Sequence, residues 1–446
     1  MPKRVDVLIL AAGEGKRMKS PTPKVLVDLL GRPLVGHVIE AARTLAPRRL
    51  VVVAGKRLPE VKAAFAGQRD VAFALQPHPK GTADAVAHGL DVLPKAAGDV
   101  VVLCGDVPLL TAETLKALLT AHRRARAGVT ALVAVVEDPT GLGRIVRDAK
   151  GGFVRIVEEK DADVETRRIR EINAGVYVFD AKRLRAHLKK VRPNNVQGEL
   201  YLTDVLEIER SSGGKVALAV ASDPAEVSGV NRPSELERAQ ALLHERFIRA
   251  HQERGVRFKA PHLTYLEAGV ELGEGTVVEP FVVLRAGVSI AARCRVGPFA
   301  HVRPGTRLEQ GVDVGAFVEV KASRLGPGAA ARHLAFLGDA DVGAGANIGA
   351  GVVTANFDGR RKHRTRIGAD AFVGSGTVLV APVSVGDGAT TGAGAVVTRG
   401  RDVPPGAVVV GVPARPLARR AGEPVGEERT PASADGRRRV RRAARR

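Results

Sequence analysis

Short apolar runs alternate with amphipathic helical segments from Val5 to Val230. Four of the runs are predicted to be strands, at Val5–Leu10, Leu50–Ala54, Val71–Leu75 and Val100–Cys104. Helical spacing lies between them in two apolar sets, Leu34, Val38 and Ala41, and Ala85, Val86, Leu90 and Leu93. Strands that alternate with helices predict a mostly parallel sheet with helices on both faces. In such sheets, ligands bind beyond the carboxyl ends of the strands.

A single long helix is predicted after this region. Pro233 opens it, and Ser234 and Glu237 have the spacing of a capping box. Apolar residues then recur at helical spacing until Gly255 ends the pattern; they are Leu236, Ala239, Leu243, Phe247 and Ala250. We interpret this segment as a helix that connects two domains.

An apolar residue recurs at every sixth position along the third region. The series is unbroken through Leu272, Val278, Leu284, Ile290, Val296, Val302, Leu308, Val314 and Val320. The frame then slips, and it resumes at Val342, Ile348, Ile367, Val373, Leu379, Val385 and Val397. Gly commonly follows the apolar residue, as in Val296-Gly297. This is the hexapeptide pattern of a parallel β-helix, in which no coil buries its apolar stripe alone and stacking drives folding.

Two segments depart from these patterns. The repeat is broken between Thr354 and Ile367, so we expect Ala355–His363 to leave the coil as a loop. After Pro416 the chain is rich in Arg and poor in apolar residues, and we expect this tail to be disordered and solvated.

Composition narrows the functional classes. The net charge of +21 suits a protein that handles phosphates, and equally a nucleic-acid binder. Aromatic residues make up only 3% of the chain, so stacking platforms for single-stranded nucleic acid are not expected. Cys104 and Cys294 offer neither a disulfide framework nor a metal cluster, and the N-terminus lacks a signal peptide. This cysteine usage fits a reducing cytosol, so we expect a cytoplasmic protein. No apolar run is long enough to span a membrane, so no transmembrane helix is expected.

The first predicted strand leads into a glycine-rich turn. Gly13 and Gly15 would let backbone N–H groups approach phosphates closely, with Arg17 and Lys24 as fixed cations. A purely structural turn explains the glycines alone equally well. Asp106 follows the fourth predicted strand, which would place its carboxylate at the binding edge of the sheet. A turn-forming Asp is the alternative.

A series of motifs occurs in order along the chain. They are Leu10–Met18 with Pro23-Lys24, Gln76 with Gly81-Thr82, Gly105–Pro108, Gly141–Ile145, Glu158–Asp161, Glu171–Gly175, Gln197–Glu199 and Gly229–Asn231. Together they resemble the motifs of sugar-1-phosphate nucleotidyltransferases. Joined to a hexapeptide β-helix, the whole resembles the family of bifunctional N-acetylglucosamine-1-phosphate uridyltransferases and glucosamine-1-phosphate acetyltransferases. The match covers nearly the whole chain except the tail.

The resemblance implies a first site, for UTP and a UDP-sugar. Gln76 and Gly81 would read the uracil. Asp106 and Asn231 would bind Mg²⁺, which prefers few protein oxygens beside water and phosphate, although Asn231 alone also suits a helix entry. Arg17, Lys24 and Mg²⁺ would offset charge on the pyrophosphate as the sugar phosphate attacks the α-phosphorus. The nucleotide residues would be Leu10, Ala11, Ala12, Gly13, Lys24, Gln76, Gly81, Thr82, Asp106 and Asn231, and the sugar residues Gly143, Glu158 and Asn173.

A second candidate site lies on the predicted β-helix. The unperturbed pKa of an imidazole, about 6.5, suits a base that takes a proton from an amine, although spacing alone also fits His333 as an exposed corner residue. His333–Ala340 resembles the catalytic segment of the acetyltransferase, which implies that His333 is the base. By the same resemblance the sugar-phosphate residues are Arg303, Lys321, Asn347 and Asn356, and the acetyl-CoA groove is lined by Ala350, Ser375 and Ala393.

The second site departs from the family pattern in three places. Phe336 and Phe357 stand where the family commonly has Tyr, and a lost hydrogen bond to a charged group can cost about 1.5–3 kcal/mol. Gly411 stands where some members have Arg. The stretch between the linker helix and Arg303 is short, as though coils were absent from it. These departures predict an acetyltransferase site that is weaker, altered in substrate, or inactive.

The predicted architecture is an α/β, Rossmann-like nucleotidyltransferase domain at residues 1–232, a linker helix at 233–255, a left-handed parallel β-helix at 256–416 and a basic tail at 417–446. The predicted function is synthesis of UDP-N-acetylglucosamine from acetyl-CoA, glucosamine-1-phosphate and UTP. The resemblance also implies a homotrimer with the acetyl site between subunits.

Two other functions remain open at this stage. One is another sugar-1-phosphate nucleotidyltransferase whose β-helix is only a trimerisation scaffold, which would not need His333, Arg303 and Lys321. The other is a non-enzymatic protein whose basic tail binds nucleic acid, which leaves Lys24, Asp106 and Asn231 unexplained. We expect neither membrane insertion nor a nucleic-acid partner.

Overall fold

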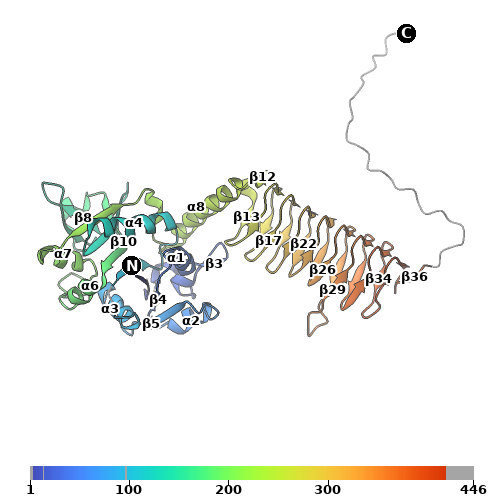
Figure 1. Ribbon diagram of the computed structural model, residues 1–446, viewed down its shortest axis with the longest axis horizontal. Helices are drawn as coiled ribbons and strands as arrows, with labels where there is room; N and C mark the ends of the chain where they lie inside the picture. The colour runs from blue at the N-terminus through green and yellow to red at the C-terminus, as the bar shows by residue number, and fades with distance from the viewer. Residues whose placement is uncertain (1–3, 14, 96–97, 418–446) are drawn as a thin grey trace, which may run out of the picture.

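The computed structural model describes residues 4–13, 15–95 and 98–417. These residues form an α/β body and a long stack of β coils, joined by one helix (Figure 1). The predicted disorder of the Arg-rich tail concerns residues that, apart from Leu417, lie outside the described ones. Within the described ranges, no helix combines the length and the apolar character needed to cross a membrane.

The α/β body is built on a sheet of nine strands. They are β1 (Val5–Ala11), β4 (Arg49–Ala54), β5 (Val71–Leu75), β6 (Asp99–Cys104), β7 (Val129–Val135), β8 (Arg144–Arg147), β9 (Phe153–Val157), β10 (Glu171–Asp180) and β11 (Val216–Val220). The main order is β11-β7-β10-β6-β1-β4-β5, and β8 pairs with β9 and β10. Only β10 runs antiparallel to its neighbours β6 and β7 in this main order. The mostly parallel sheet is confirmed, and the four predicted strands match β1, β4, β5 and β6 to within one residue at each end.

Helices cover both faces of this sheet, as predicted. They are α1 (Leu34–Arg43), α2 (Leu58–Ala64), α3 (Thr82–Val92), α4 (Ala112–Ala125), α5 (Val164–Arg167), α6 (Ala181–Leu188) and α7 (Asp204–Ser211). Alternation along β1 divides the core, since successive side chains of a strand point to opposite faces. Val7 and Ile9 pack with apolar residues of α1 and α4, whereas Leu8 packs with those of α3, α6 and α7. A small hairpin of β2 (Asp28–Leu29) and β3 (Arg32–Pro33) projects from this body.

The linker helix α8 (Pro233–Gln252) runs from the α/β body to the first coils (Figure 1). Pro233 is its first residue, so Arg232 is the N-cap and Glu235 is the third helical residue. The Glu235 carboxylate accepts hydrogen bonds from the backbone N–H groups of Asn231 and Arg232, at 2.6 and 3.1 Å. The predicted capping box of Ser234 and Glu237 was therefore wrong, because it placed the cap two residues too late. The bodies also touch directly where the Ala268 N–H donates to the Leu30 carbonyl at 2.8 Å.

The coil stack is a left-handed parallel β-helix of three sheets, and the chain visits the sheets in turn. The ten-stranded sheet contains β12 (Arg257–Phe258), β15 (Val277–Val278), β18 (Arg295–Val296), β21 (Asp313–Ala316), β24 (Ala330–His333), β27 (Asn347–Ile348), β30 (Phe372–Val373), β33 (Thr390–Thr391), β35 (Val408–Val410) and β36 (Arg415–Pro416). The eight-stranded sheet contains β13 (Tyr265–Leu266), β16 (Val283–Leu284), β19 (His301–Val302), β22 (Glu319–Lys321), β25 (Phe336–Gly338), β28 (Val353–Ala355), β31 (Val378–Val380) and β34 (Val396–Val397). The seven-stranded sheet contains β14 (Glu271–Leu272), β17 (Ser289–Ile290), β20 (Arg307–Leu308), β23 (Arg324–Leu325), β26 (Ala340–Val342), β29 (Thr365–Ile367) and β32 (Val383–Val385).

Every apolar residue of the predicted six-residue series is buried in one core. Through the slip, the inward positions are filled by Leu325, Ala331, Leu337 and Thr354. The steps from Val320 to Leu325 and from Leu337 to Val342 are five residues long instead of six, which explains the slip. The predicted loop is also confirmed: β28 ends at Ala355, β29 begins at Thr365, and the residues between them project from the stack near β29 (Figure 1).

Candidate functional sites

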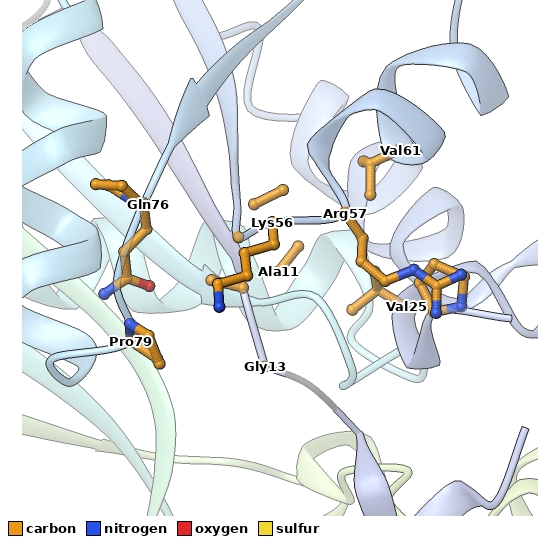
Figure 2. Close-up of a pocket in the computed structure, with 13 residues that line it drawn as sticks. Ala11, Gly13, Val25, Lys56, Arg57, Val61, Gln76 and Pro79 are labelled. Carbon is orange, nitrogen blue, oxygen red and sulfur yellow. The ribbon is translucent and has the colours of Figure 1, made fainter. Parts of the chain in front are cut away.

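Two adjoining cavities lie beyond the carboxyl ends of β1, β4, β5 and β6. Figure 2 shows the first, of about 320 Å³, with Gln76 and Pro79 on one side, Arg57 and Val61 on the other and Lys56 between them. The second, of about 290 Å³, continues past the shared residues Ala11 to Gly13 toward Asp106. Its lining includes nine of the predicted nucleotide-site residues: Leu10, Ala11, Ala12, Gly13, Lys24, Gln76, Gly81, Thr82 and Asp106.

At the deep end of the second cavity, the Lys24 ammonium joins the two predicted metal ligands. It donates to Asp106 Oδ2 at 2.5 Å and to Asn231 Oδ1 at 2.9 Å. The Arg17 guanidinium donates to the same Asn231 oxygen at 3.0 Å. The structure therefore brings all four predicted phosphate and metal residues together. Arg17 and Asn231 also line a further cavity of about 310 Å³ on the other side of this group.

Backbone geometry holds this group in place. Gly15 has φ +64°, and a Cβ there would lie 2.4 Å from Lys24 Cβ, so the turn packs directly against the lysine. The Val230 N–H donates to the Asp106 carbonyl at 2.8 Å, which ties the two ligand-bearing segments together. In contrast, a Cβ on Gly13 would meet nothing within 4 Å, so Gly13 leaves open space at the cavity wall. Open space beside backbone N–H groups is what a phosphate needs.

At the other end of the second cavity, the orientation of Gln76 is fixed. Its amide nitrogen donates to the Gly81 carbonyl at 3.1 Å and to Asp84 Oδ2 at 2.8 Å, which leaves its side-chain oxygen as an acceptor. Gly81 has φ +118°, and a Cβ there would lie 2.4 Å from the Leu200 carbonyl oxygen. The Thr82 hydroxyl oxygen accepts from the Leu202 N–H at 2.9 Å. An acceptor held in this way can read an imide N–H such as N3–H of uracil.

The three predicted sugar residues form a neighbouring group. The Asn173 N–H donates to the Gly143 carbonyl at 2.9 Å, and a Cβ on Gly143 would lie 3.2 Å from the Glu158 carboxylate. Burial, followed by the charge of Asp161, raises the pKa of the Glu158 carboxyl. Cys104 connects this group to the second cavity, because it lines that cavity and its thiol donates to the Gly175 carbonyl at 3.3 Å. Burial raises the pKa of this thiol to about 12, so Cys104 is no nucleophile at neutral pH.

On the β-helix, His333 belongs to a ladder of residues at one corner, which we call the histidine corner. The inward residues Ala331, Ile348, Val373 and Thr391 pair in register on successive coils of the ten-stranded sheet. Two residues after each inward residue lie, in order, His333, Ala350, Ser375 and Ala393. The predicted base and the three predicted acetyl-CoA residues are therefore stacked along one edge. His333, Ser375 and Ala393 are exposed in the single chain.

The predicted phosphate-binding residues lie at the next corner, after the eight-stranded sheet; we call it the cationic corner. Val302 and Val320 pair in register, which stacks Arg303 above Lys321. The neighbouring Lys362 ammonium lowers the pKa of Lys321, and Arg303 pairs with Glu319 at 2.6 Å. Asp339 follows β25 on the next coil, and its Oδ2 accepts a hydrogen bond at 2.5 Å from Asn356, which follows β28 one coil further on.

The two corners are separated by the short strand β25. Phe336 begins this strand and is half-buried, whereas Phe357 on the projecting loop is 61% exposed. Asn347 lies on the ten-stranded sheet, just before the inward residue Ile348. Gly411 follows β35 with φ +93°, and a Cβ there would meet only the Pro413 carbonyl oxygen, at 3.7 Å. The residues of the second site are thus spread over an open surface of the single chain.

Three residues with a part in these sites were not assigned from the sequence. Lys56 lines the first cavity and Glu199 the second, and Glu235 fixes the Asn231 backbone. Glu199 belongs to a motif that the sequence did show, so its position could have been inferred. Lys56 directly follows Gly55 after β4, and the rule that ligands bind beyond the strand ends could have found it. Glu235 follows from Pro233, which fixes the first turn of α8.

Comparisons with known proteins cover both bodies. Residues 7–197 match the MobA-like NTP transferase domain, and residues 364–399 match the bacterial transferase hexapeptide model of six repeats. The bifunctional protein GlmU of Streptomyces coelicolor is 44% identical over 440 residues, which cover 91% of this chain and 91% of the relative. The bifunctional protein GlmU of Mycobacterium bovis is 42% identical over 448 residues, which cover 92% of this chain and 90% of the relative. Because that similarity extends through both bodies, the chain belongs to the bifunctional GlmU family.

Proposed function

We propose that this chain makes UDP-N-acetylglucosamine with two separate sites, a uridylyltransferase site in the α/β body and an acetyltransferase site on the β-helix. As a member of the GlmU family the chain is a bifunctional enzyme that uses a nucleotide and acetyl-CoA as substrates. The first rival hypothesis, a β-helix that serves only as a scaffold, is disfavoured because the relatives named above are called bifunctional.

In the uridylyltransferase site, UTP would lie along the two adjoining cavities. The Gln76 side-chain oxygen would accept from uracil N3–H, and the backbone at Gly13 would leave room for the phosphates. The phosphate oxygen of N-acetylglucosamine-1-phosphate would attack the α-phosphorus, and pyrophosphate would leave. Arg17 and Lys24 would offset the negative charge that builds on the leaving group. Gly143, Glu158 and Asn173 would hold the sugar beside Cys104.

The donor set fits a magnesium ion. Asp106 and Asn231 each aim an oxygen at one point, and in this structure the Lys24 ammonium occupies it, so the point attracts a cation. A carboxylate and an amide oxygen are hard ligands that leave most coordination positions to water and phosphate, as Mg²⁺ prefers. In the described ranges no group of three or more His, Cys, Asp or Glu side chains could hold a metal, so a site here would rest on these two residues. When bound, the ion would neutralise phosphate charge.

In the acetyltransferase site, the amine nitrogen of glucosamine-1-phosphate would attack the acetyl carbonyl of acetyl-CoA. His333 would take a proton from this amine, and the CoA thiolate would leave. Arg303 and Lys321 would bind the sugar phosphate with Asn347 and Asn356. The small residues Ala350, Ser375 and Ala393 would give the CoA chain a groove along the histidine corner. Phe336 and Phe357 would contact the substrates without a hydroxyl group.

We further propose that the acetyltransferase site is completed by other subunits of a homotrimer. Its residues are exposed in the single chain, and an open surface excludes water poorly. The same corner also carries exposed rings on earlier coils: Phe281, Phe299 and Phe317 stack with centroids 4.8 and 4.9 Å apart. An exposed apolar ladder of this kind typically marks a contact surface. Light scattering of the full chain would report three subunits if this is right.

We propose the same domain limits as those predicted from the sequence. They are 1–232 for the nucleotidyltransferase domain, 233–255 for the linker helix, 256–416 for the β-helix and 417–446 for the tail. The end of β11 at Val220, the start of α8 at Pro233 and the start of β12 at Arg257 support the first two limits. A cytoplasmic location is also proposed, supported by the free thiols of Cys104 and Cys294.

The observation that carries the proposed function is the convergence of Lys24, Asp106 and Asn231 on one point of a cavity. Its test is release of pyrophosphate from UTP in the presence of N-acetylglucosamine-1-phosphate, with other nucleotides and sugar phosphates in parallel. Preference for this pair would support the proposal. Equal turnover of other nucleoside triphosphates would contradict the assignment of Gln76 to uracil.

A further inference from the structure

The Lys24 ammonium occupies the place between the two metal ligands. It lies 2.5 Å from Asp106 Oδ2 and 2.9 Å from Asn231 Oδ1, and its side chain is only 10% exposed. Both oxygens are thus already engaged by a cation of the chain itself. A metal ion bound by these oxygens would lie within about 2.1 Å of each, in the space that the ammonium now fills.

We propose that Lys24 is a built-in counter-ion for the metal ligands: while no nucleotide is bound it takes the place of Mg²⁺, and the metal binds when the nucleotide phosphates draw the lysine away. This rests on the proposed metal-binding role of Asp106 and Asn231. Lys24 is in this respect a positioning residue, since it holds both ligands at one point before the metal arrives.

The surrounding contacts leave the lysine as the part that moves. The backbones of Asp106 and Asn231 are tied together through Val230 and Glu235. The Cβ of Lys24 packs so closely against Gly15 that a methyl group on the Gly15 Cα would not fit. The far end of the Lys24 side chain can therefore change partners without a change of backbone. The second cavity, which Lys24 lines, is where phosphates would offer it new oxygens.

The proposal predicts the direction in which metal and nucleotide change each other's affinity for the protein. Metal and ammonium compete for the same two oxygens, so the free protein should bind divalent cations weakly. A nucleotide that engages Lys24 should raise the affinity for metal, and by thermodynamic reciprocity metal should raise the affinity for the nucleotide by the same factor. Removal of the ammonium should relieve this competition: it would leave Asp106 Oδ2 open, while Asn231 Oδ1 would keep only the hydrogen bond from Arg17.

The test uses Mn²⁺ and the full-length protein without nucleotide, with free Mn²⁺ measured by electron paramagnetic resonance. Mn²⁺ takes the same oxygen ligands as Mg²⁺. Lys24→Met should bind Mn²⁺ roughly tenfold more tightly than the wild type, within the usual range of coupling between sites. The matched control is Lys62→Met on α2, which removes the same charge from an exposed position and should behave as the wild type. Adding Asp106→Ala to Lys24→Met should abolish the gain.

Unchanged Mn²⁺ affinity in Lys24→Met would overturn the proposal, and so would an equal gain in Lys62→Met. The metal site itself is tested separately by the Mg²⁺ dependence of pyrophosphate release in Asp106→Asn. If the Mg²⁺ dependence shifts in Asp106→Asn while Lys24→Met gains no affinity for Mn²⁺, the counter-ion role of Lys24 is wrong but the proposed metal site is supported.

If Lys24→Met does not fold, the proposal can be tested on the wild-type protein. Its amines are labelled with acetic anhydride, and the labels are measured by mass spectrometry. Saturating Mn²⁺ without nucleotide should increase labelling of Lys24 and leave that of Lys62 unchanged. Constant labelling of Lys24 would overturn the proposal.

Discussion

The candidate site of the α/β body is enclosed within one chain, whereas that of the β-helix lies on its surface. In the first, Lys24 meets Asp106 and Asn231 across 82 and 207 residues of sequence, and the contacts are largely shielded from water. In the second, residues about one coil apart form ladders at two corners, and His333 faces solvent. A parallel sheet gathers distant loops at one edge, while a β-helix repeats one local position along an edge.

This difference has a functional consequence. An enclosed group of charges acts strongly, because electrostatic interactions are weakly screened there, and it needs no partner. An open ladder offers specificity along its length but excludes water poorly, and this is the reason for proposing that other subunits cover it. We therefore expect the two activities to respond to different kinds of substitution.

The largest expected effect is that of His333→Ala on acetyl transfer. Loss of a general base typically lowers the rate about 10²–10⁴-fold. Free CoA thiol released from acetyl-CoA and glucosamine-1-phosphate should fall in that range, while pyrophosphate release from UTP should not change. Arg332→Ala is the matched control, because Arg332 is the adjacent exposed residue and pairs with Asp313 at 2.7 Å. Equal losses in the two variants would show that His333 has no special role.

A smaller effect is expected from a buried histidine of the α/β body. Burial lowers the pKa of His37 to about 4, and its Nε2 lies 2.8 Å from the Leu29 carbonyl oxygen. Between pH 6.5 and 4 the unfolded chain binds the proton more readily than the folded chain, so stability is lost as the pH falls through this window. From pH 7 to 5 this one group should cost about 2 kcal/mol of unfolding free energy.

Urea unfolding of the wild type and His37→Gln at both pH values checks this value. The variant should lose less stability on acidification, even if it is less stable at pH 7. If both proteins lose the same amount, His37 is not the group that titrates.

The smallest expected effect is a gain, from Phe336→Tyr in the open site. The added hydroxyl could donate to a charged substrate group, and such a bond is worth about 1.5 kcal/mol or more. We expect kcat/KM for glucosamine-1-phosphate to rise about tenfold, with uridylyl transfer unchanged. The control is Phe372→Tyr, which adds the same hydroxyl to an exposed ring of the β-helix. No gain, or the same gain in both variants, would mean that Phe336 does not contact the substrate.

The sequence predicted the parts of the fold that depend on local pattern. Strands such as β5 and inward residues such as Val296 were found because apolar side chains must be buried at fixed intervals. Ala331 and Thr354 were missed as inward positions, because a small or polar residue carries no hydrophobic pattern. The cap of α8 was misplaced by two residues, because Ser234 and Glu237 fit the capping-box sequence whereas the actual N-cap is an arginine, Arg232.

The sites were predictable to different degrees. Asp106 could be placed at the sheet edge by the strand-end rule, and Arg17 was expected beside the glycine-rich turn, but Asn231 came only from family resemblance, because no local pattern links it to residues so far away in sequence. The ladder of His333, Ala350, Ser375 and Ala393 depends on where the coil frame slips, so it became visible only with the strand register. The position of the Lys24 ammonium between the two proposed metal ligands could not be inferred from the sequence.

The most direct test of two independent sites is to measure both activities on a single preparation of Asp106→Asn. The substitution keeps the shape of the side chain but removes its charge at the point where Lys24 and Asn231 meet. We predict that pyrophosphate release falls about 10²-fold or more, while thiol release from acetyl-CoA stays at the wild-type rate. Undiminished pyrophosphate release, or a parallel fall of both rates, would contradict the account.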